Sequence, residues 1–159
     1  MISKDEFRHA LGRFASGVTV VTSKDTDGNL HGITVSAFCS VSLDPPLILV
    51  CIDKNTGSHY ALAQTDSFVV NILRDDQQYI SDCFASFLPD KFAVVKYHSG
   101  IDDLPVLEDV VANLECRLVN SHPNGDHTIF VGQIETATIN DGQPLVYWHG
   151  DYRELTRSN

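Results

Sequence analysis

The chain has 159 residues, 43% of them hydrophobic, and a formal net charge of −10. This size and composition predict one domain, residues 1–159, with a substantial core. Nucleic acids and anionic membrane surfaces are bound by clustered lysine and arginine, so the charge argues against both as partners. The N-terminal residues form a polar helix start without an apolar signal segment, which predicts a cytoplasmic protein.

The N-terminal part of the chain predicts a helix followed by a hairpin. Ser3 and Glu6 have the spacing of a capping box, and apolar residues recur at helical spacing as far as Gly17. The β-branched stretch 18–23, the turn residues D-T-D-G-N and the segment 30–43 then predict two paired strands.

The second of these strands has an unusual pattern. Apolar residues occupy every odd position from Ile33 to Leu43, whereas four of the five even positions carry a hydroxyl. Alternate side chains of a strand point to opposite faces, so the odd residues predict a core face. The even residues predict a hydroxyl face formed by Thr34, Ser36, Ser40 and Ser42. That face is either simply solvated or binds an oxygen-rich ligand such as a phosphate.

The next segment predicts a buried strand followed by an anion site. The continuous apolar run 47–52 is typical of a central strand covered on both sides. A short helix is predicted near residues 60–62, with Thr56 or Ser58 as its N-cap. The start of this helix, beside Lys54, would attract an anion.

The remainder of the chain predicts one more helix and mainly antiparallel strands. Residues 68–73 form a predicted strand, and residues 80–87 carry the apolar face of an amphipathic helix. The stretch 88–109 is predicted to be mostly loop. Further strands are predicted over residues 114–118, 127–139 and 145–148. This order favours a small closed or partly closed antiparallel barrel over a doubly wound parallel sheet.

Local motifs identify few chemical groups. No G-x-G-x-x-G, P-loop, H-E-x-x-H or G-x-S-x-G motif is present, and the four cysteines are too widely spaced to predict a metal site or a disulfide. Six histidines, including His31, are interpreted as solvent-facing or locally bonded. His127 differs because a Pro/Gly/Asn loop gives way to a strand there, which makes it a candidate ligand-contacting residue at a barrel rim.

Five stretches in order carry a resemblance to a known family. They are F-A-S-G-V-T-V-V-T from Phe14, G-I-T-V-S-A-F-C-S-V-S-L-D-P-P-L from Gly32, F-V-V-N-I-L from Phe68, C-F-A from Cys83 and G-D-H-T-I-F-V-G from Gly125. Together they resemble the flavin reductase family, in particular the small reductase components of two-component aromatic hydroxylases such as phenol and 4-hydroxyphenylacetate monooxygenases. The resemblance extends from the first helix to Tyr152.

The resemblance implies a fold, an activity and partners. The fold would be mainly β with short helices, a single-domain split β-barrel of the Greek-key, FMN-binding type. The protein would transfer a hydride from NADH to FAD or FMN and pass the reduced flavin to a separate flavin-dependent monooxygenase in aromatic catabolism. It would be a homodimer.

The resemblance also implies site residues. The flavin ring edge and phosphate would be held, partly through backbone groups, by Thr34, Val35, Ser36, Ala37, Ser40 and Ser42. The phosphate side would be completed by Cys51, Ile52, Asp53, Lys54 and Ser58. The amphipathic helix predicted over residues 80–87 would bring Phe84 and Ala85 to the flavin. His127 would contact the nicotinamide as the catalytic residue, and Tyr152 would lie beside the NADH site.

Two other hypotheses remain open. The chain could be a flavin carrier or redox sensor without a nicotinamide site, or an oxidase of the pyridoxamine-phosphate type, which uses a related barrel and FMN. The G-D-H motif together with Tyr152 favours the reductase over both. The neighbours of Lys54 differ among members of the family, which leaves the choice between FAD and FMN open. The stretch 88–96 matches the family pattern weakly, so no site residue is assigned there.

Overall fold

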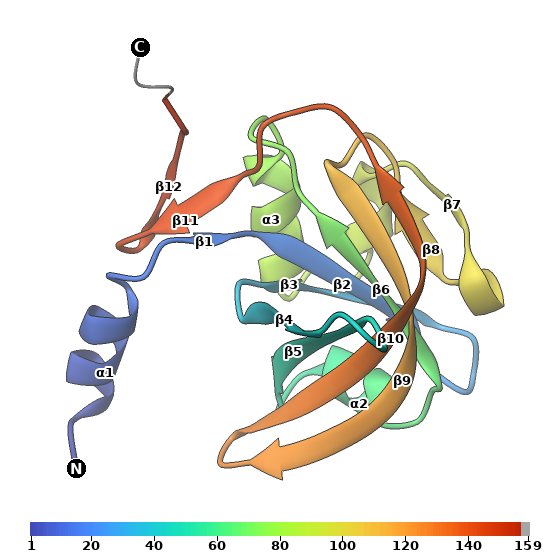
Figure 1. Cartoon of the computed structure of the whole chain (residues 1–159), viewed down its shortest axis with the longest axis horizontal. Helices are drawn as coiled ribbons and strands as arrows, with labels where there is room; N and C mark the ends of the chain where they lie inside the picture. Colours follow the sequence, from blue (N-terminus) through green and yellow to red (C-terminus); the bar gives the residue numbers. More distant parts are fainter. Residues whose placement is uncertain (157–159) are drawn as a thin grey trace.

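The computed structural model describes residues 1–156 of the chain. Its centre is a strongly curved, seven-stranded antiparallel sheet with the order β3-β2-β6-β9-β10-β5-β4 (Figure 1). The strands of this sheet are β2 (Thr19–Lys24), β3 (Leu30–Val35), β4 (Phe38–Ser42), β5 (Leu47–Asp53), β6 (Ser67–Ile72), β9 (Ala112–Asn124) and β10 (His127–Ile139). The predicted antiparallel barrel architecture is therefore confirmed.

Short helices and two small sheets surround this barrel. The helices are α1 (Lys4–Leu11), α2 (Gly57–Leu62) and α3 (Gln78–Ala85), together with the 3-10 turns η1 (Lys91–Val94) and η2 (Ile101–Asp103). One small sheet has the order β1-β11-β12, formed by β1 (Ser16–Gly17), β11 (Val146–Trp148) and β12 (Asp151–Arg153). The other consists of β7 (Tyr97–Ser99) and β8 (Pro105–Leu107). None of the helices within residues 1–156 has the length and hydropathy that crossing a membrane requires.

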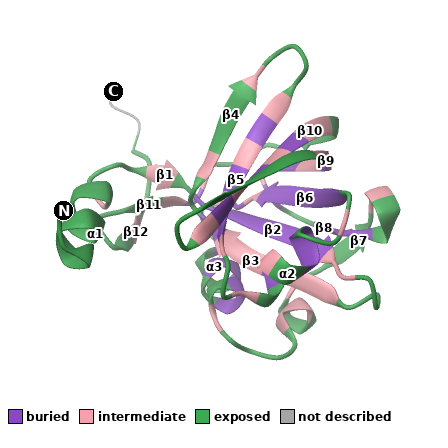
Figure 2. Cartoon of the chain, turned by 90° about the horizontal axis from the view of Figure 1, so that it is seen from below, coloured by how far each residue is buried: buried purple, intermediate pink, exposed green. Residues whose placement is uncertain are grey.

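Buried residues concentrate in β2, β6 and α3 (Figure 2), and one core cluster joins side chains of β2, β3, β5, β6, β9 and β10. Val50, Ile52, Phe68 and Phe130 are each at most 1% exposed. Close packing extends to the backbone, because a side chain at Gly132 would bring its Cβ within 2.5 Å of the Phe68 ring.

The patterned segment 30–43 is two strands, not the single strand that its alternation predicts. It turns at Ser36 and Ala37, so that β3 and β4 lie at opposite edges of the large sheet. The two-residue corner also changes which side chains point to the core, from the odd-numbered residues before it to the even-numbered residues after it. Val35 is buried before it, whereas Phe38, which pairs with Val50, packs on the core after it.

This shift overturns the prediction of one core face and one hydroxyl face. Beyond the corner the odd residues are exposed, and Leu43 is 92% exposed. Ser40 pairs with the buried Ile48, whereas Ser42 pairs with Leu47 after a register shift. Because neighbours along β5 point to opposite faces, the two serine side chains do not share a face.

Strand β5 is second from the sheet edge, which corrects the prediction of a central strand covered on both sides. Its burial alternates along the strand. Ile48, Val50 and Ile52 enter the core, whereas Leu49 and Cys51 are half-buried and line a cavity on the other face. A continuous apolar run therefore indicates here a strand whose outer face is only partly covered by its own chain.

Three further predictions differ from the structure. Helix α1 keeps the predicted capping box but ends at Leu11 rather than near Gly17, and β1 follows it. The apolar face of α3 ends before Phe87, which is fully exposed. The stretch 88–109 is not mostly loop, because it contains η1, β7, η2 and β8.

Candidate functional site

Two cavities lie at the two ends of the segment that contains the corner. The first, here called the α1-side cavity, has a volume of about 1050 Å³ and is lined by α1, residues 36–39, β5 and the start of β10. It brings together five predicted site residues: Ser36, Ala37, Cys51, Asp53 and His127. Burial raises the pKa of the Cys51 thiol, so that this side chain presents a neutral group to the cavity.

The second, here called the α2-side cavity, has a volume of about 790 Å³. Residues 30–33 of β3, the start of α2 and the segment after α3 line it. It contains three predicted site residues, Ser58, Phe84 and Ala85. The N-cap of α2 is Thr56, as predicted, because its hydroxyl accepts a hydrogen bond from the His59 amide at 3.2 Å.

The corner between the cavities is held by β3 and α3. The Thr34 hydroxyl donates to the Ser81 carbonyl at 2.6 Å and so fixes β3 to α3. Val35 and Ile52 are 5% and 1% exposed, and their side chains belong to the core. A ligand at the corner would therefore meet these two residues through their backbone groups.

Besides Tyr152, which is described below, three predicted site residues outside the corner line neither cavity. Ser40 and Ser42 lie on the outer hairpin formed by β4 and β5. The Lys54 ammonium donates to the Gly125 carbonyl at 2.7 Å, and its backbone N–H donates to the Asp126 carbonyl at 3.0 Å. Lys54 thus fixes the turn between β9 and β10 that precedes His127.

His127 is the first residue of β10 and lies on the wall of the α1-side cavity. Its Nδ1 is 2.8 Å from Oδ1 of Asp126, and its side chain is 45% exposed. The hydrogen bond with His127 lowers the pKa of the Asp126 carboxyl. This carboxylate orients the ring, and Nε2 remains available to a ligand.

Tyr152 is in β12 and lines neither cavity. Its hydroxyl donates to Oδ1 of Asp82 at 2.9 Å and is 2.8 Å from the Ser81 hydroxyl. Burial raises the pKa of Tyr152. Since Ser81 also accepts the hydrogen bond of Thr34 through its carbonyl, Tyr152 and the corner are connected through α3.

Two basic residues of the α2-side cavity were not singled out in the sequence. The Lys91 ammonium donates to the carbonyls of Phe84 at 3.0 Å and Gly32 at 3.4 Å, and burial lowers its pKa. His31 lies on the facing strand β3. Neither has a local motif, because each joins the cavity only through the pairing of distant segments. Within residues 1–156, no group of His, Cys, Asp and Glu side chains has an arrangement that could hold a metal ion.

Comparisons with known proteins assign this arrangement to a family. The flavin reductase like domain matches residues 11–156. The chain belongs to the flavin reductase family. The resemblance seen in the sequence is thereby confirmed, and with it the prediction that the protein is a flavin reductase.

Individual relatives agree with this assignment. An NADH-dependent flavin reductase from a Rhodococcus species is 43% identical over 93% of this chain and 84% of its own length. The reductase component of a 4-nitrophenol 4-monooxygenase/4-nitrocatechol 2-monooxygenase from Rhodococcus opacus is 40% identical over 95% of this chain and 80% of its own length. The solved structure of an NADH:FAD oxidoreductase from Streptomyces globisporus, in complex with NAD and FAD fragments, has a TM-score of 0.92 at 33% identity. The two structures match over 97% of this chain and 93% of the Streptomyces chain.

Proposed function

We propose that this flavin reductase oxidises NADH, reduces FAD at the corner between the two cavities, and supplies the reduced flavin to a separate monooxygenase. The observation that carries the proposal is the course of the segment 30–39, which lines the α2-side cavity with its first half and the α1-side cavity with its second. A flavin is a flat ring with a long polar tail, and its two parts fit two cavities joined by one strand corner.

The flavin supplies the redox chemistry, because its ring accepts a hydride from the nicotinamide of NADH. The chain must hold the two rings in contact, since orientation of the reacting atoms is the main contribution that a protein makes to such a transfer. Ser36, Ala37, Cys51 and Asp53 would hold the ring, partly by backbone groups. His127 would orient the nicotinamide, and Tyr152 would support that side through α3.

The composition of the α2-side cavity favours FAD over FMN. Ser58 offers a donor to phosphate oxygens, with Ala85 beside it. Phe92 and Tyr97 line the same cavity, and aromatic side chains of this kind stack on an adenine ring. FMN, which lacks the adenosine, would fill less of this space and remains the alternative cofactor.

We also propose that the protein is a homodimer. The apolar side of α1 and of the turn that follows it is not covered by the chain, since Phe7 and Leu11 of α1 are 55% and 54% exposed and Phe14 of the turn is 79% exposed. The same three side chains line the α1-side cavity together with Leu49 and Ile129. Contiguous exposed apolar surface of this kind is typical of an interface. A second copy on this face would complete the wall of the cavity.

A cytoplasmic location and a monooxygenase partner complete the proposal. The reductase component from Rhodococcus opacus belongs to a monooxygenase that acts on 4-nitrophenol. An aromatic substrate for the partner of this chain is proposed by analogy with that relative. The net charge of −10 favours neither nucleic acid nor an anionic membrane as a partner.

The test is the loss of NADH absorbance with and without added FAD. We expect rapid loss with FAD, slower loss with FMN, and little with NADPH. In air, and without any oxygenase, the reduced flavin should yield hydrogen peroxide in proportion to the NADH consumed. Flavin binding without NADH turnover would instead favour a carrier or sensor, and hydroxylation of a phenol by the purified chain alone would contradict the two-component proposal.

A further inference from the structure

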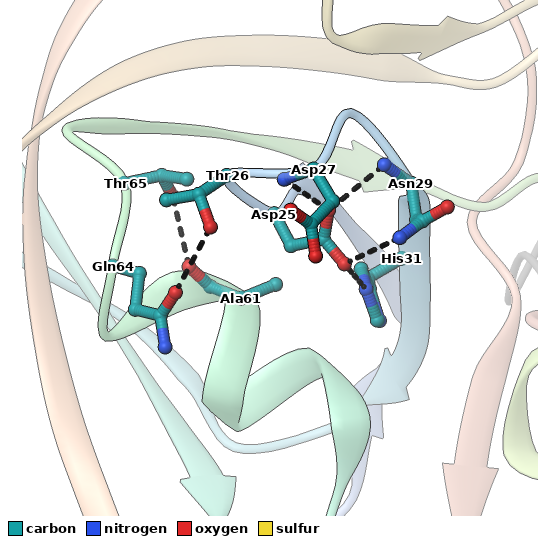
Figure 3. Close-up of polar contacts among 8 residues, drawn as sticks. All are labelled: Asp25, Thr26, Asp27, Asn29, His31, Ala61, Gln64 and Thr65. Atoms are coloured by element: carbon teal, nitrogen blue, oxygen red, sulfur yellow. Dashed lines mark hydrogen bonds and ion pairs between the residues drawn. The ribbon is translucent and has the colours of Figure 1, made fainter.

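The wall of the α2-side cavity carries a carboxylate and an imidazole in contact. His31, in β3, lines the cavity, and its Nε2 is 2.9 Å from Oδ2 of Asp25 in the turn between β2 and β3 (Figure 3). The His31 side chain is 23% exposed, so one edge of the ring remains open to the cavity. The pair thus has the geometry of a histidine positioned by an acid.

Asp25 is fixed by its own turn. Its Oδ1 accepts from the backbone N–H groups of Asp27 at 3.0 Å and Asn29 at 2.8 Å, and its Oδ2 accepts from Nδ2 of Asn29 at 3.0 Å (Figure 3). The hydrogen bond with His31, followed by those with Asn29, lowers the pKa of Asp25 to about 2. The side chain is therefore a carboxylate, and Nε2 of His31 must donate to it.

The other ring nitrogen faces the start of α2. A side chain at Gly57 would place its Cβ 3.3 Å from Nδ1 of His31, so the ring lies against the first residue of this helix. Ser58 follows directly and lines the same cavity. Within residues 1–156, no hydrogen bond joins Nδ1 to another group of the protein. This nitrogen is available to a ligand in the cavity.

We propose that His31, positioned by Asp25, binds a phosphate of the flavin as an imidazolium. The inference rests on the proposed flavin site. Nε2–H would donate to Asp25 and Nδ1–H to a phosphate oxygen, so that the cation lies between two anions.

We assign the phosphate contact to His31 because of where the other charged groups around the cavity lie and what they bind. Asp25 belongs to the turn, and Asp90 and Lys91 come from the segment after α3. The Lys91 ammonium is already bound to two carbonyls. Helix α2 contributes no acidic residue in its first turn, and its His59 is bonded through Nε2 to Thr128. His31 is therefore the group to which we assign the phosphate contact.

The experiment compares riboflavin, which has no phosphate, with FMN and FAD in titrations of the full chain followed by flavin fluorescence. For the wild-type protein, we expect FAD affinity to fall about tenfold from about pH 6 to about pH 9, while riboflavin affinity changes little. His31→Gln should lose about tenfold in affinity for FMN or FAD at the lower pH, and nothing for riboflavin.

A second variant and two controls keep the test independent of folding. Asp25→Asn retains one acceptor oxygen for the backbone N–H groups of the turn but removes the charge beside His31, so it should reduce the pH dependence of FAD binding. Asp27→Asn, in the same turn, and His122→Gln, on β9, should match the wild type. Equal loss for riboflavin and FAD in His31→Gln, or an unchanged affinity for both, would overturn the inference. A wild-type chain that binds none of the three flavins would instead refute the proposed function.

Discussion

The candidate nicotinamide contact depends on one exposed histidine. Replacing His127 by Ala should lower the rate of flavin reduction by NADH about tenfold or more, because a small misplacement of the reacting atoms is costly to hydride transfer. Flavin affinity should change little. Stopped-flow reduction of the flavin-loaded variant isolates this step.

The matched control for His127 is His122, an exposed histidine of the neighbouring strand β9. His122→Ala should reduce flavin at the wild-type rate. If His127→Ala reduces flavin as fast as the wild type, or loses flavin affinity and NADH activity together, His127 does not act on the nicotinamide.

A single glycine determines how closely β3 approaches α3. A Cβ at Gly32 would overlap the ring of Phe84 and lie 3.3 Å from Phe92. Gly32→Ala should therefore destabilise the protein by about 1–3 kcal/mol, as overpacking of a core does. Gly17→Ala, where no atom lies within 4 Å of the new Cβ, should cost less than about 0.5 kcal/mol. Urea denaturation measures both, and equal stabilities would contradict the close approach.

Some site residues could be predicted from the sequence and others could not. His127 was identified because a loop rich in Pro, Gly and Asn precedes it, which places it at a strand end. His31 and Lys91 have no such neighbours. Each acquires a possible role only because pairing brings the turn after β2, the start of α2 and the segment after α3 to one cavity. That information lies in long-range contacts, not in local spacing.

At the scale of elements, the β2–β3 turn should respond to acid. The pKa of Asp25 is about 2 in the folded protein, below its usual value of about 3.9. A lowered pKa in the folded state means that this carboxylate contributes stability above about pH 4 and loses it as the pH falls toward about 2. Asp25→Asn should therefore make the decline of unfolding free energy in this window shallower.

Urea unfolding at several pH values measures this decline, and Asp27→Asn serves as the control. The Asp27 backbone N–H donates to Asp25, and Asn retains that backbone group. The control should retain the wild-type slope. An Asp25→Asn variant with the wild-type slope would show that the turn does not favour the charged carboxylate.

Element boundaries were the least predictable feature of the fold. The corner at Ser36 and Ala37 contains neither Gly nor Pro, so an alternation over residues 33–43 that is broken only at Phe38 conceals it. Strands β7 and β8 have three residues each, too few for a period of two to be recognised. The elements β10 and α3 were found because their patterns persist over several turns or pleats, whereas β9 was predicted only over residues 114–118 of the 112–124 that it occupies.

At the scale of the molecule, the dimer proposal depends on α1. Phe14→Glu places a charge on the exposed apolar face and should weaken self-association by at least about tenfold, since buried aromatic anchors dominate interfaces. Sedimentation or light scattering should then report a monomer. Because the α1-side cavity would lose its covering, NADH turnover should fall as well.

Tyr60 provides the control for this substitution. It is 59% exposed on α2, and it lines neither cavity. Tyr60→Glu should remain a dimer with full activity. A wild-type protein that is monomeric at working concentration, or a Phe14→Glu variant of unchanged mass, would rule out α1 as the interface.

The corner at Ser36 and Ala37 also has a consequence for biosynthesis. Strands β3 and β4 are consecutive in the chain, yet the sheet between them is completed by remote pairs such as Thr19 with Ile72 and Thr128 with Ile52. Such pairs must overcome loop-closure entropy before they contribute any stability, so barrels of this kind fold slowly. During translation, β5 can pair with β4 at once but lacks its second partner until β10 leaves the ribosome. We therefore expect nascent chains to acquire flavin affinity only when synthesis is nearly complete.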